Sequence, residues 1–321
     1  MKKLKLKKNA KIGIVGIVAL IIFISIGVYS TKNIIKKKNY EKTYEYKLIN
    51  IGYSKDESDK ITTSYKDKEI EYILKDKYNK IYVDVLSDKY FIYDNLYRYL
   101  EYYKNNSDKA IRDIVEVVNV GRDKDYYTDS KETDVSKNEL MLVNKYNYLK
   151  EDYEVQDLVN IPLTYAWGDA GSQKINKNAY DAFINLWNDA KNNGYYFVVC
   201  SSYRTYQKQL DVYNNYKRSR GEKEADKIAA RAGYSEHETG YTIDMYSKGS
   251  TQSDFQNTEA YEWLIKNAHR FGFIQRYPLD KENVTGYSFE SWHYRYVGID
   301  AATYIYENNI TFDEYYAYFV K

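Results

Sequence analysis

Hydrophobic and polar residues form three successive patterns along the chain. Residues 12–31 carry no charge and lack amphipathic periodicity, and lysine clusters flank them on both sides. From Tyr40 to about Lys137, short apolar stripes at helical spacing alternate with dense Lys, Asp and Glu. After residue 138, helical stripes mix with strand-like apolar runs. We therefore expect a basic segment 1–11, a transmembrane segment 12–31, a helical region 40–137 and a domain 138–321.

The uncharged segment predicts the location of the protein. A helix of this length spans a bilayer core of about 30 Å, and Ile26–Ser30 offers neither a small-x-small cleavage motif nor a cysteine for a lipid. Six lysines precede the span and four follow it closely, which favours a cytoplasmic amino terminus. We expect a single-pass signal anchor in the cell membrane, with the rest of the chain extracellular in a Gram-positive-like envelope.

The region 40–137 reads as a set of short helices. Ser54 and Glu57 have the spacing of a helix capping box. Apolar periodicity predicts helices over Glu69–Lys77, Lys80–Leu86 and Tyr93–Tyr103. Their many charges are typical of the solvated surface of a spacer or interaction module. The non-periodic, charged stretch Gly121–Ser136 predicts a linker.

The carboxyl-terminal domain combines helices and strands in irregular order. Helices are predicted over Asn176–Asn192, Thr205–Lys217, Glu222–Ala230, Thr258–Arg270, Ala301–Glu307 and Phe312–Phe319, and strands over Tyr195–Ser201, over Phe273–Tyr277 and around Tyr287–Val297. Since no regular β-α-β alternation occurs, the expected fold class is α+β, with an antiparallel sheet and flanking helices.

The composition limits the kinds of partner and of metal site that the chain can have. Lys plus Arg number 48 and Asp plus Glu 46, and the resulting net charge of +2 does not favour a nucleic-acid partner. Removing the six lysines of the first eleven residues from this +2 leaves −4 for the remainder. One cysteine and three histidines exclude a disulfide framework and a multi-cysteine zinc ribbon within the chain. A metal site must therefore use nearly every histidine.

Three motifs in the domain carry candidate chemistry. Ser235–Asp244 places His237 and Asp244 seven positions apart around a glycine, which permits a turn that brings both to one ion. Phe289–Gly298 places Glu290 three residues before His293. Ser201–Gln207 places Arg204 just after a predicted strand, where loops carry function.

These residues fit a metallopeptidase. His237, Asp244 and His293 offer three ligands, and a catalytic zinc ion uses three protein ligands with a fourth position open. Glu290 is the expected general base, and Arg204 is expected to bind a substrate carboxylate or to stabilise an oxyanion.

The residues alone leave alternatives for some of these roles. Glu236 or Glu238 could be the base, and Glu290 could instead pair with Arg295. For His269, in the last turn of a predicted helix, a structural role is expected. Cys200, in an apolar strand, is expected to be an inert buried thiol.

The combined pattern resembles a known family. S-x-H-x-x-G-x-x-x-D, preceded by S-x-Y-R and followed by E-x-W-H-x-R-Y-V-G, is similar to the zinc carboxypeptidases of the VanY and LdcB type, the D-alanyl-D-alanine carboxypeptidase branch of the M15 peptidases. The similarity covers roughly residues 138–321 and includes Leu142–Lys145 and Arg276–Pro278. Carried over by position, it implies one zinc ion on His237, Asp244 and His293, Glu290 as base, Arg204 as a substrate or oxyanion contact, and Ser235 and Gln209 in the substrate pocket.

The resemblance also implies an activity. The expected function is removal of the terminal D-alanine from peptidoglycan stem peptides by a membrane-anchored enzyme. An L,D-carboxypeptidase, a D,D-dipeptidase or an endopeptidase on the same polymer is the alternative, and a non-catalytic cell-wall-binding protein is the alternative from another class. The sequence does not identify protein partners. Thr242, Ser291 and Ser202 depart from the family pattern beside the inferred ligands, which affects the expected pocket shape more than metal binding.

Overall fold

The computed structural model describes residues 2–167 and 173–321, with side chains from residue 18 onward. The chain forms two compact units that divide between Lys89 and Tyr90. The boundary expected from the sequence, at residues 137/138, stays a prediction. The second unit contains the expected peptidase domain together with the preceding residues from Tyr90 onward.

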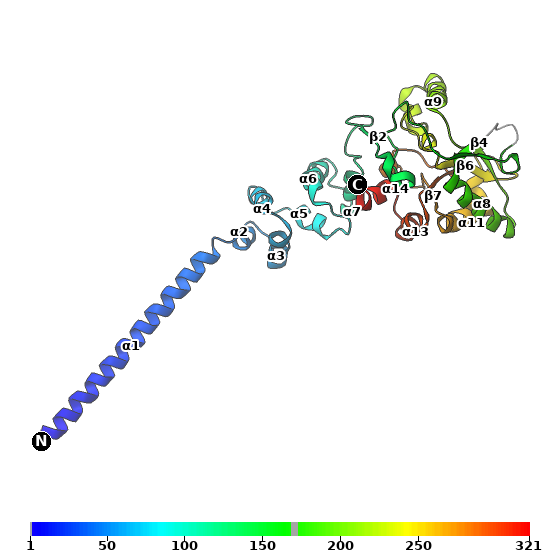
Figure 1. Cartoon of the computed structure of the whole chain (residues 1–321). Helices are drawn as coiled ribbons and strands as arrows, with labels where there is room; N and C mark the ends of the chain where they lie inside the picture. The colour runs from blue at the N-terminus through cyan, green and yellow to red at the C-terminus, as the bar shows by residue number, and fades with distance from the viewer. Residues whose placement is uncertain (1, 168–172) are drawn as a thin grey trace. The chain divides into compact units, whose positions relative to one another are not determined.

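The first unit begins with a long helix, α1 (Lys2–Tyr40), which continues past the predicted end of the apolar segment (Figure 1). Its portion Val18–Tyr40 is long and apolar enough to cross a membrane, and none of the most hydropathic stretch is buried. A helix with this length, composition and exposure suits a membrane anchor or a signal sequence.

Four short helices complete the first unit: α2 (Tyr44–Asn50), α3 (Lys55–Ser64), α4 (Asp67–Ile73) and α5 (Ile81–Asp84), the last continued by the 3₁₀ turn Val85–Ser87. Leu48, Ile61 and Ile73 are fully buried among them. The predicted capping box of α3 is confirmed, since Ser54 and Glu57 exchange hydrogen bonds of 3.2 and 2.8 Å. These helices therefore enclose a small apolar core.

The second unit contains the remaining elements. Its helices are α6 (Leu96–Lys104), α7 (Ile111–Asn119), α8 (Lys177–Asn192), α9 (Tyr206–Arg220), α10 (Glu222–Ile228), α11 (Glu259–Asn267), α12 (Glu282–Thr285), α13 (Ile299–Asn308) and α14 (Phe312–Phe319). Its strands are β1 (Lys131–Glu132), β2 (Asn147–Tyr148), β3 (Leu158–Ile161), β4 (Gln173–Asn176), β5 (Phe197–Ser201), β6 (Thr242–Ser247), β7 (Phe273–Gln275) and β8 (His293–Tyr296). Helix α7 packs beside α14, where Arg112 lies 3.2 Å from Glu314.

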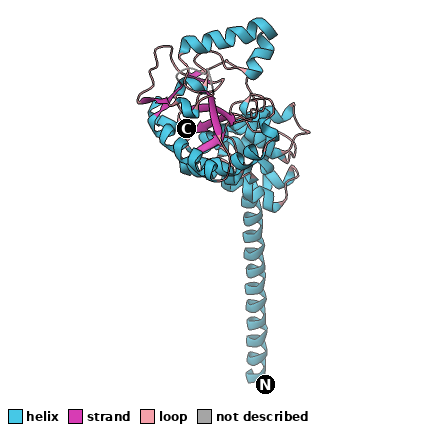
Figure 2. Cartoon of the chain, turned by 90° about the vertical axis from the view of Figure 1, so that its right-hand side faces the viewer, coloured by secondary structure: helices cyan, strands magenta, loops and turns pink. Residues whose placement is uncertain are grey.

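A four-stranded antiparallel sheet organises the second unit, in the order β5-β6-β8-β7. Figure 2 shows the strands gathered together with helices around them. The main apolar core combines Phe183 of α8, Val199 of β5, Ile243 of β6 and Leu264 of α11, all fully buried. The expected α+β class with an antiparallel sheet and flanking helices is confirmed.

The two central strands separate their side chains between two faces. Ile243 of β6 and Tyr294 of β8 are directly paired and belong to the apolar core. Because successive strand residues point to opposite faces, the next pair in register, Asp244 and His293, lies on the other face. One face of the sheet thus supplies the core, and the other carries polar side chains that could bind a ligand or take part in a reaction.

The structure differs from the sequence prediction at these same strands. Strand β6, which holds Asp244, was not predicted, because a polar residue interrupts its apolar run. The strand expected around Tyr287–Val297 is wrong over its first half: β8 begins only at His293, and the preceding residues form a loop. The backbone amide of Glu290 in that loop donates to the Tyr277 carbonyl at 3.0 Å, outside any strand ladder.

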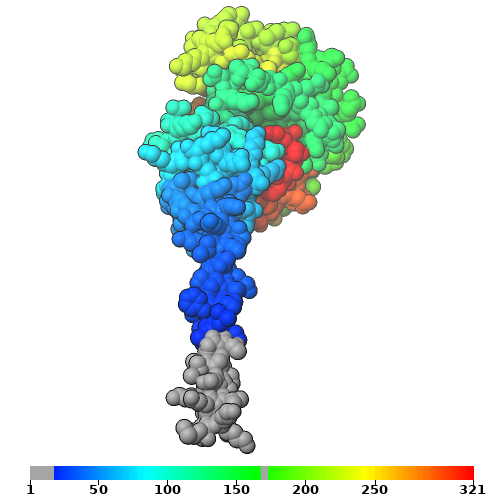
Figure 3. Space-filling view, turned by 90° about the vertical axis from the view of Figure 1, so that its left-hand side faces the viewer, coloured from blue at the N-terminus to red at the C-terminus, as the bar shows by residue number. Residues whose placement is uncertain are grey.

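Helices α9 and α10 form an edge of the second unit. In Figure 3 these residues, yellow-green, lie beside the green segment that precedes the sheet. The Lys145 amino group donates to the Asp226 carbonyl of α10, and Tyr127 packs edge-on against Tyr234 in the loop after α10, with ring centroids 4.9 Å apart. This edge provides one wall of the cleft described next.

Candidate active site

Strand pairing brings two of the predicted ligands together. Asp244 and His293 face each other directly across β6 and β8, and directly opposed residues of an antiparallel pair have neighbouring Cβ atoms. His293 Nδ1 lies 3.2 Å from Asp244 Oδ1. The register of the sheet therefore sets the positions of two of the three predicted ligands, although these two residues are far apart in the sequence.

A tight turn delivers the third ligand. His237 sits in the 3₁₀ turn Glu236–Thr239, which ends at Gly240 with φ of 77°. Only glycine adopts this backbone without strain, and a Cβ at this position would lie 2.6 Å from Val155 Cγ1. The glycine therefore lets the chain turn directly from His237 into β6, as the spacing of the motif predicted.

A hydrogen bond orients the ring of His237, and carboxylate contacts flank the ring of His293. His237 Nδ1 lies 2.8 Å from the Ser202 carbonyl oxygen, which can only accept, so Nδ1–H is the donor and Nε2 keeps its lone pair. That Nε2 lies 3.4 Å from Asp244 Oδ1. His293 presents Nδ1 to the same oxygen, while its Nε2 faces Glu236 Oε2 at 3.6 Å. Two ring nitrogens and one carboxylate oxygen thus converge.

These three residues fit a metal ion. One ligand atom from each of His237, Asp244 and His293 can be chosen so that all lie within 4.8 Å of one another, and all three residues are buried. Asp244 Oδ1 is buried and has no hydrogen-bond partner in the part of the chain that the structure describes. A buried carboxylate oxygen between two imidazole nitrogens is a donor set that suits a divalent transition metal.

The charge environment of His237 and Asp244 favours the forms of these two residues that bind metals. Burial and the neighbouring Arg204 guanidinium lower the pKa of His237 to about 4, which leaves the ring neutral at neutral pH. Burial opposes ionisation of Asp244, but His237 and His293 hold the pKa of this carboxyl well below its usual range. Ionised carboxylate and neutral imidazole are the forms that bind metals.

Glu290 occupies the position of a general base. Its Oε2 lies 3.3 Å from His293 Nδ1, so it borders the ligand group without facing Asp244 across the sheet. Burial raises its pKa, against the opposing hydrogen bond from His293. A carboxylate with a raised pKa next to a metal group is suited to accept a proton and return it.

The other two candidate bases have structural partners. Glu238 accepts backbone N–H bonds from Gly233 and Ser235 at 2.9 and 3.3 Å and so caps its own turn. Glu236 is fully buried and pairs with Arg295 at 3.1 Å. Arg295 therefore engages Glu236, and the pairing of Glu290 with Arg295 that the sequence left open does not occur.

Arg204 borders the ligand group from the other side. Its NH2 lies 3.3 Å from Asp244 Oδ2, and its NH1 donates to Gln209 Oε1 at 3.0 Å. Gln209 is buried and also donates to the Ala230 carbonyl at 2.8 Å. Ser235 accepts from the His237 amide at 3.3 Å, which makes it a cap of the turn. All three side chains border the same cleft.

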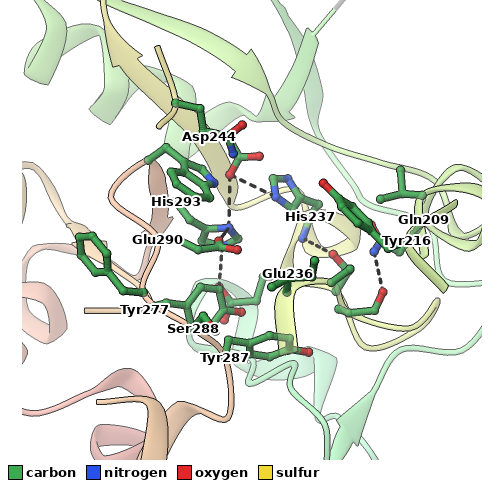
Figure 4. A pocket seen from close by; sticks show the side chains of 18 of the residues that line it. Gln209, Tyr216, Glu236, His237, Asp244, Tyr277, Tyr287, Ser288, Glu290 and His293 are labelled. Atoms are coloured by element: carbon green, nitrogen blue, oxygen red, sulfur yellow. Dashed lines mark hydrogen bonds and ion pairs between the residues drawn. The ribbon is translucent and has the colours of Figure 1, made fainter. Parts of the chain in front are cut away.

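The cleft has a volume of about 510 Å³ and collects the candidate residues in one place (Figure 4). Figure 4 shows Glu290, His293, Asp244 and His237 converging on one region, with Tyr277 and Tyr287 on one side and Tyr216 and Gln209 on the other. A volume of this size suits a short peptide segment better than a single small ion.

The three departures from the family pattern lie at the margins of this group. Thr242 and Ser291 are fully buried, and Ser291 donates to Gln256 at 3.2 Å. Ser202 supplies the carbonyl that orients His237. None of the three substitutes for a ligand.

The two residues that we assigned structural roles are also accounted for. His269 stacks on Tyr306 with ring centroids 3.9 Å apart. Cys200 donates from Sγ to the Asp244 carbonyl at 3.2 Å, and burial raises its pKa to about 12. This thiol is therefore inert at neutral pH.

Sequence reasoning missed the buried charges behind the site. Arg276 and Arg295, both fully buried, contact Glu236 at 2.7 and 3.1 Å. Arginine is rarely fully buried unless it is paired, so an arginine inside a strand-like apolar run, as at Arg276, was the signal that could have revealed them. Their acidic partners lie far away in the sequence, and only the fold identifies them.

Comparisons with known proteins agree with this geometry. A family model described as VanY, D-alanyl-D-alanine carboxypeptidase, matches residues 172–299. The chain is 36% identical over 201 residues to YodJ of Bacillus subtilis (strain 168), an alignment that covers 60% of this chain and 74% of YodJ. A D-alanyl-D-alanine carboxypeptidase of Enterococcus faecalis (strain ATCC 700802 / V583) is 35% identical over 185 residues, which cover 55% of this chain and 65% of that protein.

A solved structure gives the same result. The structure of the LdcB LD-carboxypeptidase aligns with a TM-score of 0.54 and 38% identity, over 57% of this chain and 87% of that one. The family match spans the turn with His237, both central strands and the loop with Glu290. The chain therefore belongs to the VanY D-alanyl-D-alanine carboxypeptidase family of metallopeptidases.

Proposed function

We propose that the protein is a membrane-anchored zinc carboxypeptidase that removes the terminal D-alanine from peptidoglycan stem peptides. The observation that carries this proposal is the convergence of His237, Asp244 and His293 with Glu290 in one cleft. The Enterococcus faecalis relative, a D-alanyl-D-alanine carboxypeptidase, supports the substrate. The apolar helix Val18–Tyr40 supports the anchor. The six lysines before the span favour a cytoplasmic amino terminus, with the cleft outside the cell.

His237, Asp244 and His293 would hold one zinc ion. Bound there, zinc would polarise the scissile carbonyl and lower the pKa of a water molecule.

The chain's own residues supply the remaining steps. Glu290 accepts the proton of the attacking water and delivers it to the leaving amine of D-alanine, for which its raised pKa is suited. Arg204 presents its guanidinium to the negative charge of the substrate, either the terminal carboxylate or the oxyanion. Gln209 and Ser201 hold Arg204 in this orientation through hydrogen bonds of 3.0 and 2.9 Å. Ser235 fixes the backbone of the turn that carries His237.

A second candidate is an L,D-carboxypeptidase. The likeness to LdcB LD-carboxypeptidase supports it. The identities of 38% to LdcB and 35% to the Enterococcus faecalis enzyme are too similar to separate the two specificities. Both reactions use the same catalytic residues, and they differ in which peptide bond the cleft accepts.

One experiment separates these functions. The full chain, purified in detergent, is incubated with stem pentapeptides ending in D-alanyl-D-alanine and with tetrapeptides ending in a single D-alanine, and mass spectrometry follows the products. Conversion of the pentapeptide to a tetrapeptide, abolished by a chelator and restored by Zn²⁺, is the expected result. Conversion of the tetrapeptide alone establishes the L,D reaction. The absence of any chelator-sensitive product would overturn both and favour a wall-binding role.

A further inference from the structure

A chain of buried ionic contacts leads away from the metal group into the protein. His293 Nε2 faces Glu236 Oε2 at 3.6 Å, and Glu236 Oε1 accepts from Arg276 Nε at 2.7 Å. Arg276 NH1 donates to Asp313 Oδ2 at 2.6 Å. The side chains of Glu236, Arg276 and Asp313 are at most 2% exposed. The contacts therefore connect a candidate ligand on β8 to helix α14 at the end of the chain.

The charges of this cluster balance. Arg295, also fully buried, contacts Glu236 Oε1 at 3.1 Å. Two arginines and two carboxylates are thus enclosed together, and burial of an unpaired member would be costly. The carboxylate that faces His293 is therefore fixed in place by contacts with two buried guanidinium groups.

Arg276 joins the two acidic residues as no lysine could. Its planar guanidinium donates to Glu236 from one edge and to Asp313 from another, whereas an ammonium is a point charge that matches one carboxylate at a time. Asn144 completes the cluster, since its amide donates to Asp313 Oδ1 at 2.8 Å. Asp313 is thereby held by two partners from different parts of the second unit.

The geometry assigns Glu236 a role in orienting His293. A ligating histidine usually donates its other ring N–H to a carboxylate, which sets the tautomer and raises the basicity of the ligand nitrogen. We propose that Glu236 is the positioning residue that directs His293 Nδ1 toward the metal, and that Arg276 and Asp313 hold Glu236 in place. The ion pair between Asp313 and Arg276 then affects metal affinity from a distance. This inference rests on the metal centre of the proposed function.

Two adjacent residues of α14 allow a matched test. Asp313 contacts Arg276, whereas Glu314 is equally buried but contacts Arg112 at 3.2 Å and caps its own helix at Thr311. Asp313→Asn removes the negative charge that pairs with Arg276. Glu314→Gln changes the same helix but leaves the buried cluster of Glu236, Arg276 and Asp313 intact. If both variants acted equally, the cause would be helix docking alone.

The experiment measures metal affinity directly. Full-length wild type, Asp313→Asn and Glu314→Gln, purified in detergent, are titrated with Zn²⁺ against a competing chelator, and the absorption of Co²⁺-loaded protein reports ligand geometry. We expect Asp313→Asn to weaken Zn²⁺ binding about tenfold and to alter the Co²⁺ spectrum, within the range for residues that support metal ligands. We expect Glu314→Gln to bind as wild type does.

Arg276→Lys provides the second route. It keeps the positive charge but cannot span both carboxylates, so it should also weaken Zn²⁺ binding, even if Asp313→Asn does not fold. Unchanged affinity in a folded Asp313→Asn or Arg276→Lys protein would overturn the inference, as would equal weakening in Glu314→Gln. Failure of the wild type to bind Zn²⁺ would instead overturn the proposed function, so the two failures are distinguishable.

Discussion

The cleft side and the buried side of His293 differ in chemistry, although they belong to one residue. On the cleft side, Nδ1 lies beside Asp244 and Glu290, side chains that line the cleft. On the buried side, Nε2 faces Glu236, which pairs with two arginines enclosed in the protein. The comparison indicates two separate roles. The cleft residues act on the substrate, and the buried residues hold the His293 ring in its orientation. Substitutions on the two sides should therefore fail in different ways.

The largest expected effect belongs to the cleft side. Glu290→Ala should reduce D-alanine release by about 10²- to 10⁴-fold, because it removes the proton acceptor. Bound zinc and thermal stability should stay at wild-type levels. Peptide hydrolysis assays and metal analysis of the purified protein check this, with exposed Glu262→Ala as the control. A Glu290→Ala enzyme with near-normal turnover would remove this residue from the proton-transfer role.

Arg204 provides the next test on the cleft side. Arg204→Lys keeps the charge but loses the forked contact with Ser201 and Gln209. We expect kcat/KM to fall by about 10²- to 10³-fold, the range for lost transition-state donors. Arg218→Lys, on the exposed surface of α9, is the control. If only KM changed, Arg204 would bind the substrate carboxylate; if kcat fell as well, it would stabilise the transition state.

Outside both sides, the turn that carries His237 should respond in stability. Gly240→Ala combines a left-handed backbone with a Cβ 2.6 Å from Val155, whereas Gly249→Ala has φ of 96° but open space around it. We expect Gly240→Ala to lower the free energy of unfolding by about 1–3 kcal/mol more than Gly249→Ala does. Denaturation followed by tryptophan fluorescence measures this. Equal losses would mean that the Val155 contact relaxes at no cost.

The smallest expected effect is a pH dependence of the free energy of unfolding that arises from Lys145. Its buried amino group donates to the carbonyls of Asp226 in α10 and Gly286 after α12. Burial and the nearby Arg122 lower its pKa from 10.5 to about 7. Between these values the unfolded chain binds more protons than the folded one, so the Lys145 contribution to the free energy of unfolding increases with pH.

Wild type should therefore gain stability between pH 7.5 and 9, and Lys145→Met should lose this slope. Tryptophan fluorescence during chemical denaturation at the two pH values measures it, since Trp167, Trp187, Trp263 and Trp292 all lie in the second unit. A slope that persists in Lys145→Met would assign the proton uptake to another group.

The comparison also explains what the sequence could and could not predict. His237, Asp244, His293 and Glu290 could be proposed from spacing, because metal chemistry restricts the residue types at these positions. The structure brings these four residues together, although their catalytic and ligand roles stay predictions. Strand β6 escaped prediction because Asp244 breaks its apolar pattern, so the polar residue that matters for function concealed the strand that carries it.

The buried cluster was invisible for a different reason. Glu236 and Asp313 are ordinary charged residues in the sequence, and only the place of Arg276 in a strand-like apolar run distinguishes it locally from a solvated charge. Their meaning comes from tertiary pairing across 40 and 37 positions of the chain. Periodicity captures what one element buries, but it does not identify which distant charge neutralises another.

The inert thiol of Cys200 has a practical consequence. It is the one cysteine of the chain, its Sγ is engaged with the Asp244 carbonyl, and burial raises its pKa to about 12. Thiol-directed reagents react with the thiolate, so they would leave this residue untouched at neutral pH. A cysteine introduced at Tyr216, an exposed position at the rim of the cleft, would then be the single labelling site. Spin labels or fluorophores there could report substrate entry in the otherwise unaltered protein.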